Sequence, residues 1–159
     1  MAKVIICAEL TEARNIRCPD AKIYVSGVGL SNILQAPRLE LKPSDKIINV
    51  GYVGSAIYPI GTVISVSKCM RLNKPKITCE KILTLKPCYA DDVCYTADDF
   101  IEDKEIKMPL VDMELYYLAS IYPQIQSIKI VSDNFDLEEH RQDDFKASWE
   151  IVNEVINKL

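Results

Sequence analysis

Short apolar runs, rich in β-branched residues, recur along the chain between polar segments. They lie at residues 4–8, 23–26, 46–50, 62–67 and 93–96, and a last run begins at Ile128. Runs of this length that are bounded by Gly, Pro, Asp, Asn or Ser predict buried or half-buried strands. The pattern therefore predicts a sheet built from several short strands.

Helical spacing of apolar residues recurs between and after these runs. Residues 111–122 carry apolar side chains at intervals typical of a largely buried helix, which a proline ends. A shorter helix, interrupted by a proline, is expected over residues 31–41. The apolar face of a final helix consists of Phe145, Trp149, Val152, Ile156 and Leu159. Asp143 or Asp144 would cap that helix. Strands that alternate with helices predict an α/β domain with a mostly parallel sheet.

Carboxylates stand where apolar runs end or helices begin. Glu12 follows the first run, Asp133 comes at the end of the run from Ile128, and Glu114 opens a helix. A helix start favours the ionised form of Glu114. Because ligands bind beyond the carboxyl ends of strands in α/β sheets, the three carboxylates are expected at one rim. A carboxylic acid paired with a carboxylate is the equipment for cleaving a glycosidic bond. Helix caps and solvated loops also use such acids, so both interpretations stay open.

Composition limits the class of protein. The 159 residues fit one domain over residues 1–159, and 48% hydrophobic with 26% charged residues is a globular composition. A net charge of -4 gives no attraction to phosphate backbones or anionic lipid, so neither nucleic acid nor membrane is an expected partner. The basic residues within 68–86 lack interleaved aromatics and indicate a solvated face. The first apolar run is too short for a secretory signal, which predicts a cytoplasmic protein.

Cofactor and metal motifs are missing from the sequence. Gly27 and Gly29 do not begin a dinucleotide fingerprint, because Asn32 stands in place of the third glycine. No Gly-Lys-Ser/Thr occurs, so a P-loop is also excluded. The six cysteines form no Cys-x-x-Cys pair and lie far from His140, so we expect no metal site and no cofactor. The scattered thiols are expected to pack as small hydrophobes.

The chain resembles the nucleoside phosphorylase and nucleosidase superfamily, and most closely its methylthioadenosine/S-adenosylhomocysteine nucleosidase-like hydrolases, in a shortened form. The Val-Asp-Met-Glu and Ser-Asp-x-x-Asp segments together are specific. The matching segments follow the family order over nearly the whole chain, at residues 8–12, 26–29, 48–51 with Gly54, 61–65, 98–101, 111–114 and 131–136. The resemblance implies a nucleoside phosphorylase-like fold, with a mixed, mostly parallel sheet flanked by helices, and a homodimer.

The resemblance also implies a hydrolase that splits a purine-type nucleoside into free base and ribose. Asp133 would be the general acid that protonates the purine ring, and Ser132 would orient it. Glu12 would position and deprotonate the attacking water. An acid and a base on opposite faces of the sugar carbon imply direct displacement by water, with inversion.

Further residues would bind the nucleoside. By the same resemblance, Glu114 would hold the ribose hydroxyls, Met113 would pack beneath the sugar, and Phe100 would stack on the base. Gly54 and Ile101 complete the expected substrate-binding set.

Departures from the family pattern leave two alternatives open. The hairpin expected between Glu12 and Ile23, which in relatives helps to cover the site and build the dimer, is nearly absent. Tyr52 replaces a small residue, and Glu9 stands where an apolar residue often lines the 5′ end of the sugar. One alternative is a catalytically silent module that binds a nucleoside or a protein. The other is a phosphorylase, although the glycine segment after residue 50 carries no arginine for phosphate.

Overall fold

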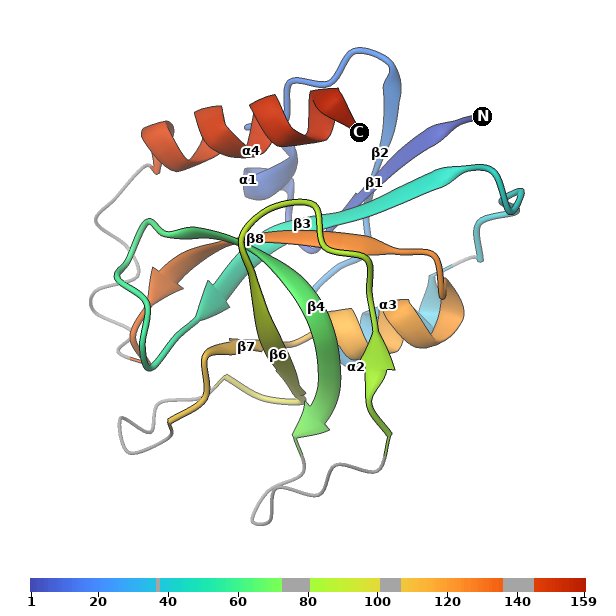
Figure 1. The fold of residues 1–159 in the computed structure, drawn as a ribbon. Coiled ribbons are helices and arrows are strands. Elements are labelled where there is room, and N and C mark those ends of the chain that lie inside the picture. Colours follow the sequence, from blue (N-terminus) through green and yellow to red (C-terminus); the bar gives the residue numbers. More distant parts are fainter. Residues whose placement is uncertain (37, 73–80, 101–106, 136–144) are drawn as a thin grey trace.

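The computed structural model describes residues 1–36, 38–72, 81–100, 107–135 and 145–159. Within them, strands and helices alternate along much of the chain (Figure 1). The strands are β1 (Lys3–Cys7), β2 (Ala21–Val25), β3 (Lys46–Gly54), β4 (Val63–Leu72), β5 (Leu83–Thr84), β6 (Asp91–Ala97), β7 (Leu110–Asp112) and β8 (Gln126–Asp133). The helices are α1 (Leu10–Ala13), α2 (Gly29–Gln35), α3 (Leu115–Ile121) and α4 (Lys146–Lys158).

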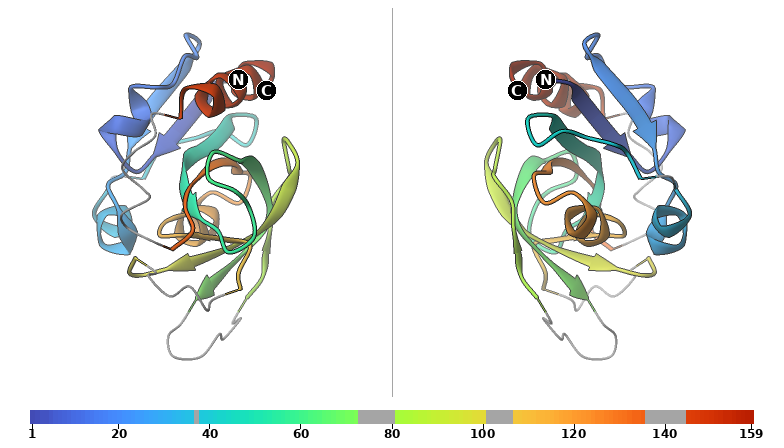
Figure 2. Two further views of the ribbon diagram at one scale, coloured as in Figure 1. Left: turned by 90° about the vertical axis from the view of Figure 1, so that its left-hand side faces the viewer. Right: turned by 90° about the vertical axis from the view of Figure 1, so that its right-hand side faces the viewer.

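All the described strands belong to one 8-stranded sheet. Strands β1, β2, β3 and β8 run parallel, as do β4, β6 and β7, whereas β3·β7, β4·β8 and β4·β5 are antiparallel pairs. The pairs β3·β7, β7·β6, β6·β4, β4·β8 and β8·β3 close part of the sheet into a ring (Figure 2). The expected mixed, mostly parallel sheet with flanking helices is confirmed. The ring brings the ends of β3, β6, β7 and β8 towards one region, and the pairing of β1 with β3 places the end of β1 beside them.

Helices cover the sheet on two sides. One core cluster joins the sheet to α2 and α3 through Ile33, Leu115 and Leu118. A second joins it to α4 through Trp149, Val152 and Ile156. Figure 1 shows α4 beside α1 on one side of the strands, with α2 and α3 on the other. No helix in the described ranges is both long enough and apolar enough to cross a membrane.

Two expected helices have different bounds in the structure. The helix expected over residues 31–41 begins at Gly29 and ends at Gln35, because Ala36, which precedes a proline, is extended. The helix expected from Val111 is instead strand β7 followed by α3. The apolar residues Leu110 and Val111 also fit a short buried strand. The Asp112 carboxylate then accepts the N–H of Leu115, the residue at which α3 begins. The cap expected for the last helix lies outside the described residues.

Candidate active site

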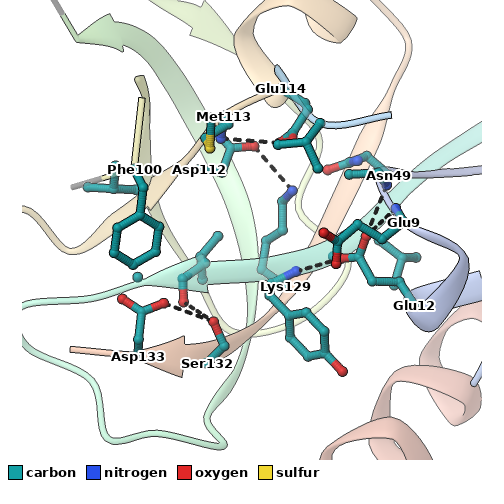
Figure 3. Close-up of a pocket in the computed structure, with 18 residues that line it drawn as sticks. Glu9, Glu12, Asn49, Phe100, Asp112, Met113, Glu114, Lys129, Ser132 and Asp133 are labelled. Carbon is teal, nitrogen blue, oxygen red and sulfur yellow. Dashed lines mark hydrogen bonds and ion pairs between the residues drawn. The ribbon is translucent and has the colours of Figure 1, made fainter. Parts of the chain in front are cut away.

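A cavity of about 130 Å³ opens where β1, β3 and β8 end. Its lining combines residues from these ends with residues from the β7–α3 junction and Phe100, which follows β6 (Figure 3). Among the lining residues are seven of the eight that the sequence predicts as catalytic or substrate-binding: Glu12, Gly54, Phe100, Met113, Glu114, Ser132 and Asp133. Ile101 lies outside the described residues. The cavity is therefore the candidate active site.

Glu12 is held rigidly at one end of the cavity. It is 3% exposed, and its Oε1 accepts the backbone N–H groups of Ala8 and Glu9 at 3.0 and 2.8 Å. Its Oε2 accepts the N–H of Tyr52 at 3.0 Å. A Cβ on Gly51 would lie 2.7 Å from that oxygen, so only glycine leaves room for the carboxylate there. Burial raises the pKa of Glu12, while Lys129 and the N–H donors oppose the rise.

Glu114 lies at the start of α3. Its Oε1 accepts the Gly29 N–H at 3.3 Å and its Oε2 the Met113 N–H at 3.2 Å. Burial and the adjacent charge of Asp112 raise the pKa of Glu114 to about 7. The expectation that the helix start favours its ionised form is therefore wrong in its net effect, because burial and a like charge outweigh the helix dipole.

The sequence interpretation missed a buried ion pair beside these carboxylates. Lys129 Nζ lies 3.2 Å from Asp112 Oδ2, and the two side chains are 3% and 0% exposed. Burial lowers the pKa of Lys129, whereas Asp112 and the other nearby acidic groups raise it. The second effect is the larger, so the pKa of Lys129 lies above its usual value. The available signal was a lysine between Ile128 and Ile130 in a strand buried on both faces.

Asp133 lies at the other end of the cavity. The Ser132 hydroxyl donates to its Oδ2 and the Phe135 N–H to its Oδ1, each at 3.0 Å. Phe135 itself has a left-handed backbone with φ 67°, a conformation that is rare for a residue with a side chain. A Cβ on Gly54 would lie 2.7 Å from the Phe135 ring and 2.9 Å from Asp133 Oδ1. Glycine is therefore required for the carboxylate to occupy this position.

Figure 3 shows how the cavity is divided. Phe100 lies over Asp133 at one end, Glu9 and Glu12 lie at the other, and Glu114 lies near the β7–α3 side. The carboxyl groups of Glu12 and Asp133 can thus contact opposite ends of one ligand. The described residues contain no cluster of His, Cys, Asp or Glu that could hold a metal ion.

The other residues considered from sequence lie around this arrangement. Tyr52 lines the cavity, and its hydroxyl accepts a hydrogen bond from Trp149 Nε1 of α4 at 3.0 Å. Arg14, Arg17 and Arg38, the arginines in the first part of the chain, are not among the residues that line the cavity. Within the described ranges the cysteines are free thiols and mostly buried, as expected of small hydrophobic side chains.

Comparison with known proteins gives a fold but no sequence family. No family model matches the chain, and no curated protein matches its sequence. A nucleosidase (MTAN) from Chlamydia trachomatis bound to MTA superposes with a TM-score of 0.78 and 18% identity, over 100% of this chain and 99% of that chain. A Helicobacter pylori MTAN mutant with 5′-methylthioadenosine in its active site gives 0.74 and 12%, over 99% of each chain.

A second enzyme type has the same architecture. A futalosine hydrolase mutant of H. pylori superposes with a TM-score of 0.72 and 13% identity, over 100% of both chains. The sequence resemblance is thus confirmed at the level of the fold, and the chain has the nucleoside phosphorylase-like fold of these nucleosidase and hydrolase structures.

Proposed function

We propose that this protein is a nucleoside N-glycosidase that hydrolyses a purine-type nucleoside to free base and ribose. One observation carries the proposal: Glu12 and Asp133, each 3% exposed, lie at opposite ends of one cavity with Glu114 beside it. A buried acid and a buried base on either side of a sugar carbon fit direct displacement by water with inversion.

Asp133 is the proposed general acid. Its proton passes to a ring nitrogen of the purine as the glycosidic bond breaks, so that the base leaves as a neutral molecule. The Ser132 hydroxyl and the Phe135 N–H bind one oxygen each and fix the orientation of the carboxyl group. They also stabilise the carboxylate that remains after proton transfer.

Glu12 is the proposed general base. Its raised pKa makes it a stronger proton acceptor for the attacking water, while its backbone N–H donors hold it in one orientation. The charge of Lys129 opposes the effect of burial, which favours an ionised Glu12 before reaction.

The remaining residues would bind the nucleoside. Glu114 would accept hydrogen bonds from ribose hydroxyls, and Met113, its neighbour in the cavity wall, would pack against the sugar. Phe100, which lies over Asp133, would stack on the base. Gly54 leaves room for the Asp133 carboxylate that would meet the base.

Charge in the cavity supports water rather than phosphate as the nucleophile. Lys129 is the only cationic side chain among the described residues that line the cavity, and it is already paired with Asp112. A phosphate anion beside Glu12 would meet like charge without a free cation. A phosphorylase is therefore the weaker candidate.

The solved structures support a small-molecule ligand. Among the similar structures, C. trachomatis MTAN is bound to MTA in one and to adenine in another. We extend this to a purine-type nucleoside here and leave its 5′ group to experiment.

We also propose a cytoplasmic homodimer. The exposed apolar side chains of edge strand β2, at Ile23, Tyr24 and Val25, support a contact between copies, and light scattering of the purified protein tests it.

Product analysis tests the function. The purified protein is incubated with purine nucleosides that differ in base and 5′ group, with and without phosphate, beside a known nucleosidase. Free base and ribose in equal amounts under both conditions are expected, and Asp133→Asn should abolish their release. Sugar phosphate formed only with phosphate would indicate a phosphorylase. Nucleoside binding by calorimetry without base release would indicate the silent module.

A further inference from the structure

The segment after β6 is held in place by hydrogen bonds at Asp98, two residues before Phe100. Asp98 accepts a hydrogen bond from the Tyr117 hydroxyl of α3 and one from Arg71 Nη2 of β4, the latter at 3.2 Å. The Arg71 guanidinium also lies 5.8 Å from the centre of the Tyr117 ring. Three segments that are distant in sequence thus meet at Asp98.

This cluster is not needed to attach α3 to β6. Thr96 already makes that attachment, because its hydroxyl donates to Asp112 Oδ1 at 2.6 Å and accepts the Tyr116 N–H at 2.9 Å. β6 ends at Ala97, directly after this buried contact. What the Asp98 cluster adds is a fixed direction for the chain beyond the strand.

The ionisation states fit a lasting hydrogen bond. Burial and Asp98 raise the pKa of Tyr117 to about 12, so the hydroxyl keeps its proton over the physiological range. Tyr117, followed by Arg71, lowers the pKa of Asp98, so that group stays ionised as the acceptor.

Phe100 is a side chain that needs such support. It lines the cavity, yet it is 38% exposed, whereas Phe135 and Phe145 are 3% and 4% exposed. Close packing fixes the two buried rings. The ring of Phe100 lacks packing on part of its surface, so its position depends on the backbone that carries it.

We propose that Arg71, Asp98 and Tyr117 are positioning residues that fix the ring of Phe100 over the base-binding end of the cavity. The proposal rests on the proposed function, in which Phe100 stacks on the base. It assigns part of the binding of the base to a cluster that lies outside the cavity lining and touches no substrate.

Fluorine NMR tests the positioning role without substrate. The chain contains three phenylalanines, so labelling with fluorophenylalanine gives three resonances, and Phe100→Leu assigns one. Asp98→Ala should shift and broaden the Phe100 resonance and leave those of Phe135 and Phe145 in place. Asp98→Asn, which keeps an acceptor for Tyr117, should give a smaller change. Asp91→Ala, at the other end of β6, is the matched control and should change none. An unmoved Phe100 resonance in Asp98→Ala would overturn the proposal.

Steady-state kinetics tests the consequence for the base. Asp98→Ala should raise KM about fivefold, with kcat within about twofold, because a ring that is no longer fixed stacks less well on the base. In a Phe100→Leu background the same change should have no further effect, because the two residues act through one contact. An equal rise of KM in both backgrounds, or a fall of kcat alone, would contradict the role. Absence of base release by the wild type would refute the proposed function, and the fluorine spectra would still decide the positioning role.

Discussion

Lys129 Nζ lies 3.2 Å from Asp112 Oδ2 in a part of the cavity wall that water barely reaches. Asp112 also accepts the Thr96 hydroxyl and the Leu115 N–H, so one carboxylate joins β6, β8 and the start of α3. The ammonium of Lys129 in turn moderates the pKa of Glu12 and of Glu114. A single ion pair therefore supports both the local fold and the charge balance of the candidate site.

Lys129→Met should lower the free energy of unfolding. The change keeps the apolar stem but leaves Asp112 buried without its cation, which costs about 3–5 kcal/mol of unfolding free energy for a buried pair. Urea unfolding followed by circular dichroism measures the loss. Lys158→Met is the matched control, because Lys158 pairs with Glu154 at the surface, and it should cause no measurable change.

A second change separates the charge effect from packing. Adding Asp112→Asn to Lys129→Met removes the unpaired charge and should restore part of the lost stability. A Lys129→Met protein as stable as the Lys158→Met control would show that the pair contributes little.

Glu114 should make the protein less stable as the pH rises from about 4.5 to about 7. Its pKa in the folded protein is raised from the ordinary value of 4.5 to about 7, so the folded state holds a proton that the unfolded state has lost. Stability from this group is complete below the unfolded pKa and is lost through that window, by about 3 kcal/mol at most. Unfolding free energies of the wild type and Glu114→Gln at pH 5 and pH 8 check the sign. Parallel pH dependences in the two proteins would contradict the raised pKa.

Gly54→Ala should damage the acid end of the cavity more than the fold. The added Cβ would meet the Phe135 ring at 2.7 Å and Asp133 Oδ1 at 2.9 Å, so the ring or the carboxylate must move. Such overpacking costs about 1–3 kcal/mol of stability. A displaced proton donor should lower kcat about a hundredfold. Base release and thermal unfolding measure the two effects. An unchanged kcat would contradict the prediction and show that the Phe135 ring moves and leaves the carboxylate in place.

The sequence predicts much of this fold because its strongest signals are local. Apolar runs mark β1, β3, β4, β6 and β8, and acids after them mark the cavity rim. Strand β7 was missed because Val111 and the apolar residues after it also fit a helix. The closure of β3, β7, β6, β4 and β8 into a ring depends on pairing between distant segments, which no short pattern encodes.

The candidate site was predictable to a similar extent. Glu12, Glu114 and Asp133 stand out as acids beside apolar segments, and the resemblance gives them roles. Asp112 and Lys129 were missed, because a charged residue within a strand identifies its partner only when the sheet is assembled. The raised pKa of Glu114 likewise follows from burial beside Asp112, which the helix position alone does not reveal.

Glu12→Gln should stop hydrolysis while substrate binding persists. In the wild type one carboxylate oxygen accepts the N–H groups of Ala8 and Glu9, and the other accepts the N–H of Tyr52. In the variant the NH₂ group of the amide replaces one of these oxygens, so a hydrogen-bond donor faces another donor. The variant also has no basic group for the water proton, and kcat should fall about 10²–10⁴-fold. Binding should change little, because Glu114 and Phe100 are intact. Assays of base release measure kcat, and calorimetry measures the Kd of the substrate. Glu154→Gln at the surface is the control. A Glu12→Gln protein with kcat within tenfold of the wild type would assign the base to another group.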